Sequence, residues 1–149
     1  MNRLAKRASI ALCACLLAGL TVSAGAEPPA QIVDTISSKQ FASKRSGEIL
    51  VDVREPGEWA ATGLPTDGIG ISVSRIDFVA AVLQAAGGNK SQPVAVICRS
   101  GARSSKAAQL LADAGFTHVT NIGDGMMGNE TVGEGWQAAG LPTAACKVC

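Results

Sequence analysis

Short apolar runs alternate with amphipathic segments along most of this chain of 149 residues. The runs within 48–53 and 93–97 are nearly continuous and rich in β-branched residues, which is typical of buried strands. Three further runs, at 31–33, 69–73 and 118–122, predict additional strands.

Segments with apolar residues at helical spacing separate these runs. Longer helices are predicted over 75–86 and 104–114, and shorter helical segments at 37–41, 55–59 and 136–139. The residues expected to face the core from the two longer helices are Phe78, Val79, Val82, Leu83, Ala107, Leu110 and Leu111.

Strands and helices therefore alternate, which predicts an α/β layer fold with a mainly parallel sheet. No internal repeat is visible in the sequence. In such sheets functional sites lie beyond the carboxyl ends of the strands. The segments that follow the runs at 48–53 and 93–97 are therefore the first candidates to carry functional residues.

The first residues have the composition of an export signal. Three basic residues precede an apolar, uncharged run at 10–22, and small residues follow it up to Ala26. This order predicts a cleavable signal peptide over 1–26. The apolar run is shorter than the roughly 20 residues that span a bilayer, although an uncleaved anchor remains the alternative.

Cleavage after Ala26 would leave residues 27–149 as a single domain in the periplasm or outside the cell. This part carries ten Lys and Arg residues against twelve Asp and Glu residues, a net charge of −2. Nucleic-acid-binding domains usually carry a basic surplus, so no nucleic-acid partner is expected. No second apolar run is long enough to span a membrane after signal cleavage.

Three of the five cysteines would remain after cleavage: Cys98, Cys146 and Cys149. An odd number in an exported protein implies one pair and one free thiol. Cys146 and Cys149, in the C-terminal tail 146–149, are the candidate disulfide, which leaves Cys98 free. A redox-active pair that exchanges with Cys98 is a second interpretation. A metal site is disfavoured because two ligands are too few.

Cys98 ends the buried run at 93–97 and is followed by Arg99, Gly101 and Arg103. Glycine reaches backbone conformations closed to other residues, so successive amides of this loop can converge on one anion. The next helix adds the partial positive charge of its N-terminus. These surroundings favour a thiolate and would hold an anionic substrate. Cys98 is therefore the candidate nucleophile, and a buried core cysteine is the alternative.

His118 is the only histidine, and it begins the run at 118–122. The helix predicted between Cys98 and His118 leads away from Cys98, so His118 is expected at the opposite edge of the sheet. A Cys–His pair is therefore not expected. Activation of Cys98 is predicted to come from the loop and the helix alone.

Three segments resemble the rhodanese family and follow one another in the family's order. The loop 98–104 matches C-x-x-G-x-R-S, and the segment 52–59 matches D-V-R-x-x-x-E/W. The segment 123–142 resembles the family's ending, with Gly123, Trp136 and then Gly-Leu-Pro. The resemblance implies a rhodanese-like three-layer fold, in which helices flank a mainly parallel central sheet.

The resemblance also implies sulfur transfer through a persulfide of Cys98, without a cofactor. Sulfane sulfur would pass from a small donor such as thiosulfate to cyanide or to a thiol acceptor. Asp52 and Arg54 would lie beside the active loop and help to shape it. The residues expected to bind the substrate and the persulfide are Arg99, Ser100, Gly101, Ala102, Arg103 and Ser104.

Two features depart from the family pattern. The segment 63–68 lacks the histidine that the family often carries there. The stretch 127–135 is longer than the family's usual linker. It is interpreted either as a flap over the site or as a mobile surface loop.

Two other functions fit parts of the sequence. A persulfide carrier or interaction module, working with a thiol-redox protein, would hold sulfur on Cys98 and use free thiosulfate poorly. A phosphatase or arsenate reductase would need five residues between Cys and Arg, whereas only the four residues 99–102 separate Cys98 from Arg103. The shorter loop predicts a pocket suited to one sulfur atom.

Overall fold

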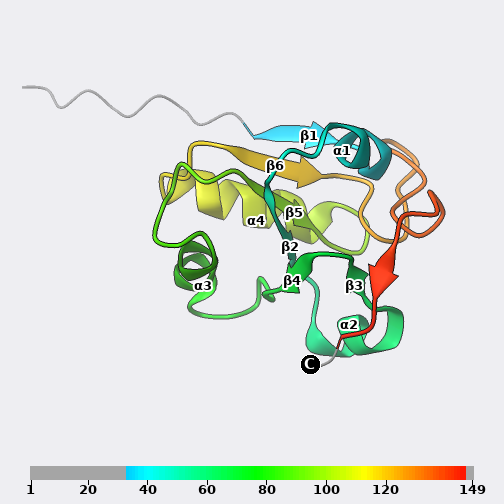
Figure 1. The fold of residues 1–149 in the computed structure, drawn as a ribbon, viewed down its shortest axis with the longest axis horizontal. Helices are drawn as coiled ribbons and strands as arrows, with labels where there is room; N and C mark the ends of the chain where they lie inside the picture. Colours follow the sequence, from blue (N-terminus) through cyan, green and yellow to red (C-terminus); the bar gives the residue numbers. More distant parts are fainter. Residues whose placement is uncertain (1–32, 147–149) are drawn as a thin grey trace, which may run out of the picture.

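The structure is a computed structural model that describes residues 33–146. Five strands form its central sheet in the order β1-β6-β5-β2-β4, and every neighbouring pair is parallel (Figure 1). The prediction of a mainly parallel sheet is confirmed. The strands are β1 Asp34–Ile36, β2 Ile49–Asp52, β4 Gly68–Gly70, β5 Val94–Ile97 and β6 Val119–Ile122.

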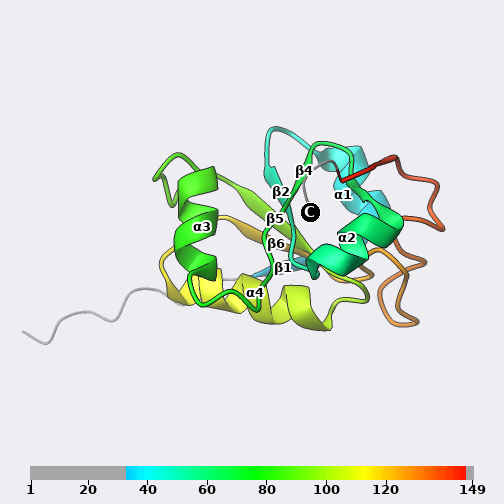
Figure 2. The ribbon, with the colours of Figure 1, turned by 90° about the horizontal axis from the view of Figure 1, so that it is seen from below.

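Helices cover both faces of this sheet, and Figure 2 shows the longest of them, α4, running along one face. The short helix α1 begins after Ser37, whose hydroxyl accepts a hydrogen bond from the Gln40 amide. The helices are α1 Ser38–Lys44, α2 Pro56–Thr62, α3 Phe78–Ala85 and α4 Ala102–Asp113.

Two apolar cores lie on opposite faces of the sheet, because successive strand residues point to opposite sides. One core packs the sheet against α3 and α4 and includes Val51, Val96, Phe78, Val82, Ala107 and Leu111. The other packs it against α1 and the C-terminal segment and includes Leu50, Ile97, Phe41, Ile122 and Trp136. These two buried sets produce the three layers that the resemblance implied.

Several boundaries differ from the sequence predictions. The first strand lies at Asp34–Ile36 and not at 31–33, because backbone pairing with β6 and not hydropathy defines this edge strand. The strand predicted at 69–73 runs over Gly68–Gly70. Residues 31 and 32 lie outside the described residues.

The prediction that Leu110 and Leu111 both face the core is wrong for Leu110. Leu111 is fully buried, whereas Leu110 is 38% exposed. Adjacent helical residues point about 100° apart, so one of the two must lie at the border of the buried stripe. On α3, Phe78 and Val82 are buried, and Val79 and Leu83 are half-buried.

A second, two-stranded sheet lies where the sequence predicted a turn at 62–68. Strand β3 Leu64–Pro65 pairs antiparallel with β7 Thr143–Ala144. This pairing places the C-terminal segment against the end of α2 (Figure 1). Cys146, just beyond β7, is disulfide-bonded. Cys149 and the predicted signal peptide 1–26 lie outside the described residues.

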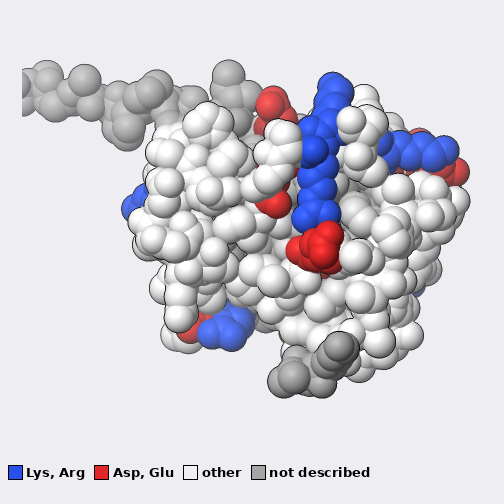
Figure 3. All heavy atoms as spheres, viewed as in Figure 1, with Lys and Arg blue, Asp and Glu red and all other residues white. Residues whose placement is uncertain are grey.

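Charged side chains are sparse on the face drawn in Figure 3, where the most prominent Lys and Arg atoms end beside acidic side chains. Arg45 and Asp67 form an ion pair at 3.7 Å. Within residues 33–146, none of the helices combines the length and the apolar character needed to cross a bilayer.

Candidate active site

Cys98 directly follows β5, at the carboxyl edge of the sheet where the sequence predicted it. Its side chain is buried, with 1% of the residue exposed. The amide of Gly101 donates a hydrogen bond to its sulfur at 3.1 Å. An N–H group and a helix N-terminus therefore face the sulfur, and both stabilise a negative charge on it.

Helix α4 begins at Ala102, two residues earlier than predicted, with Gly101 as its N-cap. Ala102, Arg103 and Ser104 therefore belong to its first turn. The Ser104 hydroxyl donates to the Gly101 carbonyl at 3.1 Å. The side chains of Arg99 and Ser100 are exposed, so this part of the loop can contribute to ligand binding through its backbone and through the Arg99 charge.

Gly101 cannot be replaced without strain. Its φ is +98°, in the region that favours glycine, and a Cβ there would lie 2.1 Å from the Gly123 carbonyl oxygen. The loop after β5 thus packs directly on the loop after β6. This close approach explains why the active loop needs a glycine at this position.

The segment after β6 holds the active loop through three hydrogen bonds. The amides of Met126 and Met127 donate to the carbonyls of Cys98 and Arg99 at 2.8 and 2.9 Å. The Asn129 side chain donates to the Ser100 carbonyl at 3.1 Å. Figure 2 shows this segment and α2 on either side of the loop that enters α4. The stretch 127–135 is therefore tied to the active loop.

Asp124 anchors that segment, and the sequence reasoning missed it. Its buried carboxylate accepts hydrogen bonds from the Ser38 amide and hydroxyl at 2.8 and 2.7 Å, and from the Gly135 amide at 3.2 Å. An acidic residue between two glycines, Gly123 and Gly125, was the available signal, because a charge is expensive to bury unless hydrogen bonds compensate it.

Arg103 forms a bidentate ion pair with Glu58 of α2, at 2.6 and 2.8 Å. The hydrogen bonds to Arg103 lower the pKa of Glu58 from 4.5 to about 2. The same pair raises the pKa of Arg103. The guanidinium predicted to bind substrate is thus engaged with Glu58, which the sequence reasoning had not singled out. The acidic position of the D-V-R-x-x-x-E match was the signal.

Asp52 and Arg54 form a buried ion pair, with Arg54 Nη2 2.7 Å from Asp52 Oδ2. Arg54 also donates to Thr62 Oγ1 and to the Gly63 carbonyl, each at 2.7 Å. These contacts run from β2 to the end of α2. The hydrogen bonds of Arg54 thus fix α2, the helix that carries Glu58. The expected contribution of Asp52 and Arg54 to the shape of the active loop stays a prediction.

His118 precedes β6, at the amino end of that strand. Because β5 and β6 are parallel, Cys98 and His118 lie at opposite edges of the sheet. Its Nδ1 is 2.8 Å from the Thr117 hydroxyl. The structure therefore separates these two residues, as the sequence predicted.

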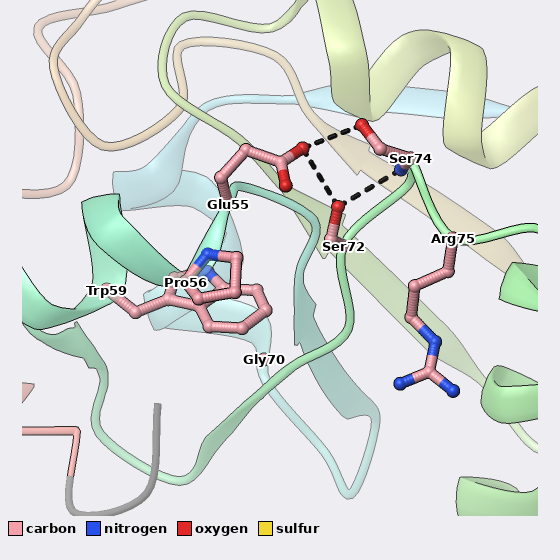
Figure 4. Close-up of a pocket in the computed structure, with 7 residues that line it drawn as sticks. All are labelled: Glu55, Pro56, Trp59, Gly70, Ser72, Ser74 and Arg75. Carbon is pink, nitrogen blue, oxygen red and sulfur yellow. Dashed lines mark hydrogen bonds between the residues drawn. The ribbon is translucent and has the colours of Figure 1, made fainter.

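A cavity of about 320 Å³ lies between α2 and the segment that follows β4, beyond the carboxyl ends of β2 and β4 (Figure 4). Glu55 Oε1 accepts hydrogen bonds from the hydroxyls of Ser72 and Ser74 at 2.9 and 2.7 Å. The residues that line the cavity are Glu55, Pro56, Trp59, Gly70, Ser72, Ser74 and Arg75.

The family model of the Rhodanese-like domain matches residues 28–130. The chain belongs to this family. A sulfurtransferase from Allochromatium vinosum is 29% identical over 113 residues, which cover 76% of this chain and 94% of the relative. The family model covers two of the three resembling segments in full, 52–59 and 98–104, and the first residues of the third.

Solved structures of the same fold are also similar to this chain. Rv0390 from M. tuberculosis has a TM-score of 0.61 and 27% identity, and the match covers 76% of this chain and 98% of that one. The polysulfide-sulfur transferase homodimer from Wolinella succinogenes has a TM-score of 0.55 and 26% identity, with 77% and 80% covered. Membership of the rhodanese-like family supports a function of the sulfurtransferase type.

Proposed function

We propose that this protein transfers sulfane sulfur through a persulfide on Cys98, from a small donor such as thiosulfate to cyanide or to a thiol. The observation that carries the proposal is the hydrogen bond from the Gly101 amide to the Cys98 sulfur. It supports a site suited to a negatively charged sulfur, at the N-terminus of α4. The name of the Wolinella relative, a polysulfide-sulfur transferase, adds support for sulfane sulfur as the transferred group.

The first step is a displacement at sulfur. The Cys98 thiolate attacks the outer sulfur of thiosulfate, the S–S bond breaks, and sulfite leaves with the electron pair. In the second step the acceptor attacks the outer sulfur of the persulfide, and Cys98 departs as a thiolate. Both steps balance without an external oxidant or reductant, and no cofactor is required.

Loop geometry supports a single sulfur atom as the occupant and not a tetrahedral oxyanion. The chain turns into α4 only four residues after Cys98. Arg103, which would be the residue to grip phosphate oxygens, is held by Glu58. Hydrolysis of an aryl phosphate that disappears in Cys98→Ser would contradict this assignment.

Turnover of thiosulfate and cyanide to thiocyanate tests the proposed reaction. The purified protein is expected to form thiocyanate, and Cys98→Ser is expected to form none above the uncatalysed rate. Ser91→Ala serves as the control, since its side chain is exposed and lies outside the active loop. Equal rates for the protein and Cys98→Ser would refute the role of Cys98.

A persulfide carrier is the second candidate, and the position of Met127 favours it. This side chain is 50% exposed although its amide bonds the carbonyl of Arg99. An exposed, adaptable apolar side chain beside a reactive sulfur suits docking of a thiol-redox protein. A carrier would gain one sulfur on Cys98 and yet turn over thiosulfate slowly.

We further propose that the protein is exported to the periplasm or secreted after cleavage behind Ala26. The disulfide at Cys146 supports this location, because disulfides persist in oxidising compartments. Cys149 is the proposed partner. The intact mass of the exported protein is expected to correspond to a chain that begins at Glu27, and retention of 1–26 would contradict the assignment.

A further inference from the structure

We propose that the cavity between α2 and the segment after β4 binds the sulfur acceptor, and that it selects a small thiol carrying a positively charged ammonium group. This inference rests on the proposed sulfur transfer and names its second substrate. Four observations carry it: the position of the cavity, its charge, the hydrogen bonds of Glu55 and its apolar wall.

The cavity lies at the same edge of the sheet as Cys98. Strand β2 is hydrogen-bonded to β5 on one side and to β4 on the other, with Asp52 opposite both Ile97 and Gly70. The cavity opens beyond the carboxyl ends of β2 and β4. Two strand spacings are roughly 10 Å, so a short thiol held there can extend its sulfur to the persulfide.

Glu55 supplies the uncompensated charge of this cavity. Arg75 also lines it, but its guanidinium is engaged in two hydrogen bonds with Asp77, at 2.9 and 2.8 Å. On α2, the nearby carboxylate of Glu58 is neutralised by Arg103. The lining therefore presents a negative charge to a ligand, and the cavity disfavours an anionic donor such as thiosulfate.

The Glu55 carboxylate is held in place and keeps acceptor capacity. The Ser72 and Ser74 hydroxyls both donate to Oε1, and an ionised carboxylate offers about four acceptor positions. Figure 4 shows both hydrogen bonds meeting at this one oxygen, while the other oxygen has none to the residues drawn. An ammonium group can therefore bond the second oxygen without displacing either serine.

The opposite wall suits the alkyl part of such a thiol. Pro56, Trp59 and Gly70 form it, and the Trp59 ring packs so closely on Gly70 that a Cβ there would lie 2.9 Å from the ring. A cation beside an indole is further stabilised by the ring's negative face. The donor and the acceptor thus have separate places: loop amides for an anion, and the Glu55 cavity for a cation.

Transfer to this acceptor balances without a further reactant. The acceptor thiolate attacks the outer sulfur of the Cys98 persulfide, and the bond from that sulfur to Cys98 breaks. Cys98 leaves as a thiolate, and the acceptor departs as its own persulfide. The ammonium group keeps its charge throughout and serves only to hold and orient the molecule.

Binding can be measured apart from turnover by NMR of the indole N–H groups. The chain has two tryptophans, and the Trp136 indole donates to the Pro142 carbonyl at 3.0 Å, away from the cavity. The probes are S-methylated 4-aminobutanethiol, a cation that cannot accept sulfur, and S-methylated 4-mercaptobutyrate, its anionic counterpart.

The cation is expected to shift the Trp59 signal saturably and to leave the Trp136 signal in place. In Glu55→Gln its Kd should rise about tenfold, the loss of a charge-assisted hydrogen bond. Glu48→Gln, which removes one charge outside the cavity, is the control and should bind normally. Equal binding of the anion, or an unchanged Kd in Glu55→Gln, would overturn the proposal.

Kinetics separate failure of the cavity from failure of the enzyme. With thiosulfate as donor, the protein is expected to prefer 4-aminobutanethiol to 4-mercaptobutyrate, and Glu55→Gln to reduce that preference about tenfold in kcat/KM. Thiocyanate formation without any preference between the two thiols would refute the assignment of the cavity to the acceptor and leave the proposed sulfur transfer unaffected. Saturable cation binding without turnover of any acceptor would refute the proposed enzyme activity and would still support the cation site.

Discussion

At Gly101, both the backbone conformation and a close contact require a residue without a Cβ. The φ of +98° costs a residue with a Cβ about 1–2 kcal/mol, and the carbonyl of Gly123 occupies the place of that Cβ. The glycine lets the loop after β5 and the loop after β6 touch. It also delivers the amide that bonds the Cys98 sulfur.

Gly101→Ala is therefore expected to lower the free energy of unfolding by about 3 kcal/mol or more, since strain and overpacking add. Gly88→Ala is the matched control. Gly88 has a φ of +78° but open space around its Cβ position, so only the strain of about 1 kcal/mol applies. Denaturant unfolding of both variants measures the difference, and equal losses would refute the contact with Gly123.

Glu58 connects pH to stability through its pair with Arg103. Its pKa is lowered from 4.5 to about 2, chiefly by the hydrogen bonds from Arg103. A lowered folded-state pKa stabilises the protein above the unfolded value, and this contribution is lost as the pH falls from 4.5 toward 2. Glu58→Gln should flatten the stability profile in this window. Identical profiles for the two proteins would show that the pair contributes nothing.

Among the elements, α4 combines two functions on one helix. Its N-terminus faces the sulfur, while its buried stripe fixes it on the sheet through Ala107, Ala108 and Leu111. The segment after β6 and helix α2 hold the active loop from two sides, by backbone hydrogen bonds and by the Arg103–Glu58 pair. The loop is thus positioned by packed elements and not by its own sequence alone.

Adjacent leucines of α4 give this packing a direct test. Leu111→Ala is expected to cost about 2–5 kcal/mol, because it empties a fully buried site. Leu110→Ala removes the same atoms from a residue that is 38% exposed, and should cost about 1 kcal/mol or less. Thermal unfolding distinguishes them, and a larger loss at Leu110 would contradict the register of the helix.

Across the whole molecule, the Arg103–Glu58 pair and strand β7 lie at different ends of α2. Glu58 and Arg103 meet near its start, whereas Gly63, beyond its end, packs against Ala144 of β7. Cys146 follows β7 and is disulfide-bonded. Strand β7 therefore lies against the far end of α2, away from the pair that borders the active loop.

The double substitution Cys146→Ser/Cys149→Ser is accordingly expected to retain thiocyanate formation within about twofold, because we propose that this pair closes a loop and does not relay sulfur. The same variant should unfold at a lower denaturant concentration. Loss of turnover with unchanged stability would instead assign the tail to the resolving role.

The parallel sheet, the position of Cys98 and the remoteness of His118 all follow from local patterns. Buried strands are short β-branched runs, and parallel strands set the edges of the sheet. Asp124 and Glu58 escaped prediction because their partners, Ser38 and Arg103, are far away in sequence. The pairing of β3 with β7 joins segments of two residues that carry no periodic signal.

The most direct test of the account is the intact mass of the protein after brief exposure to thiosulfate and removal of small molecules. Sulfur transfer through Cys98 predicts a gain of one sulfur atom that maps to Cys98, is released by cyanide and is absent in Cys98→Ser. No gain, or a gain located on another residue, would contradict sulfur transfer through Cys98.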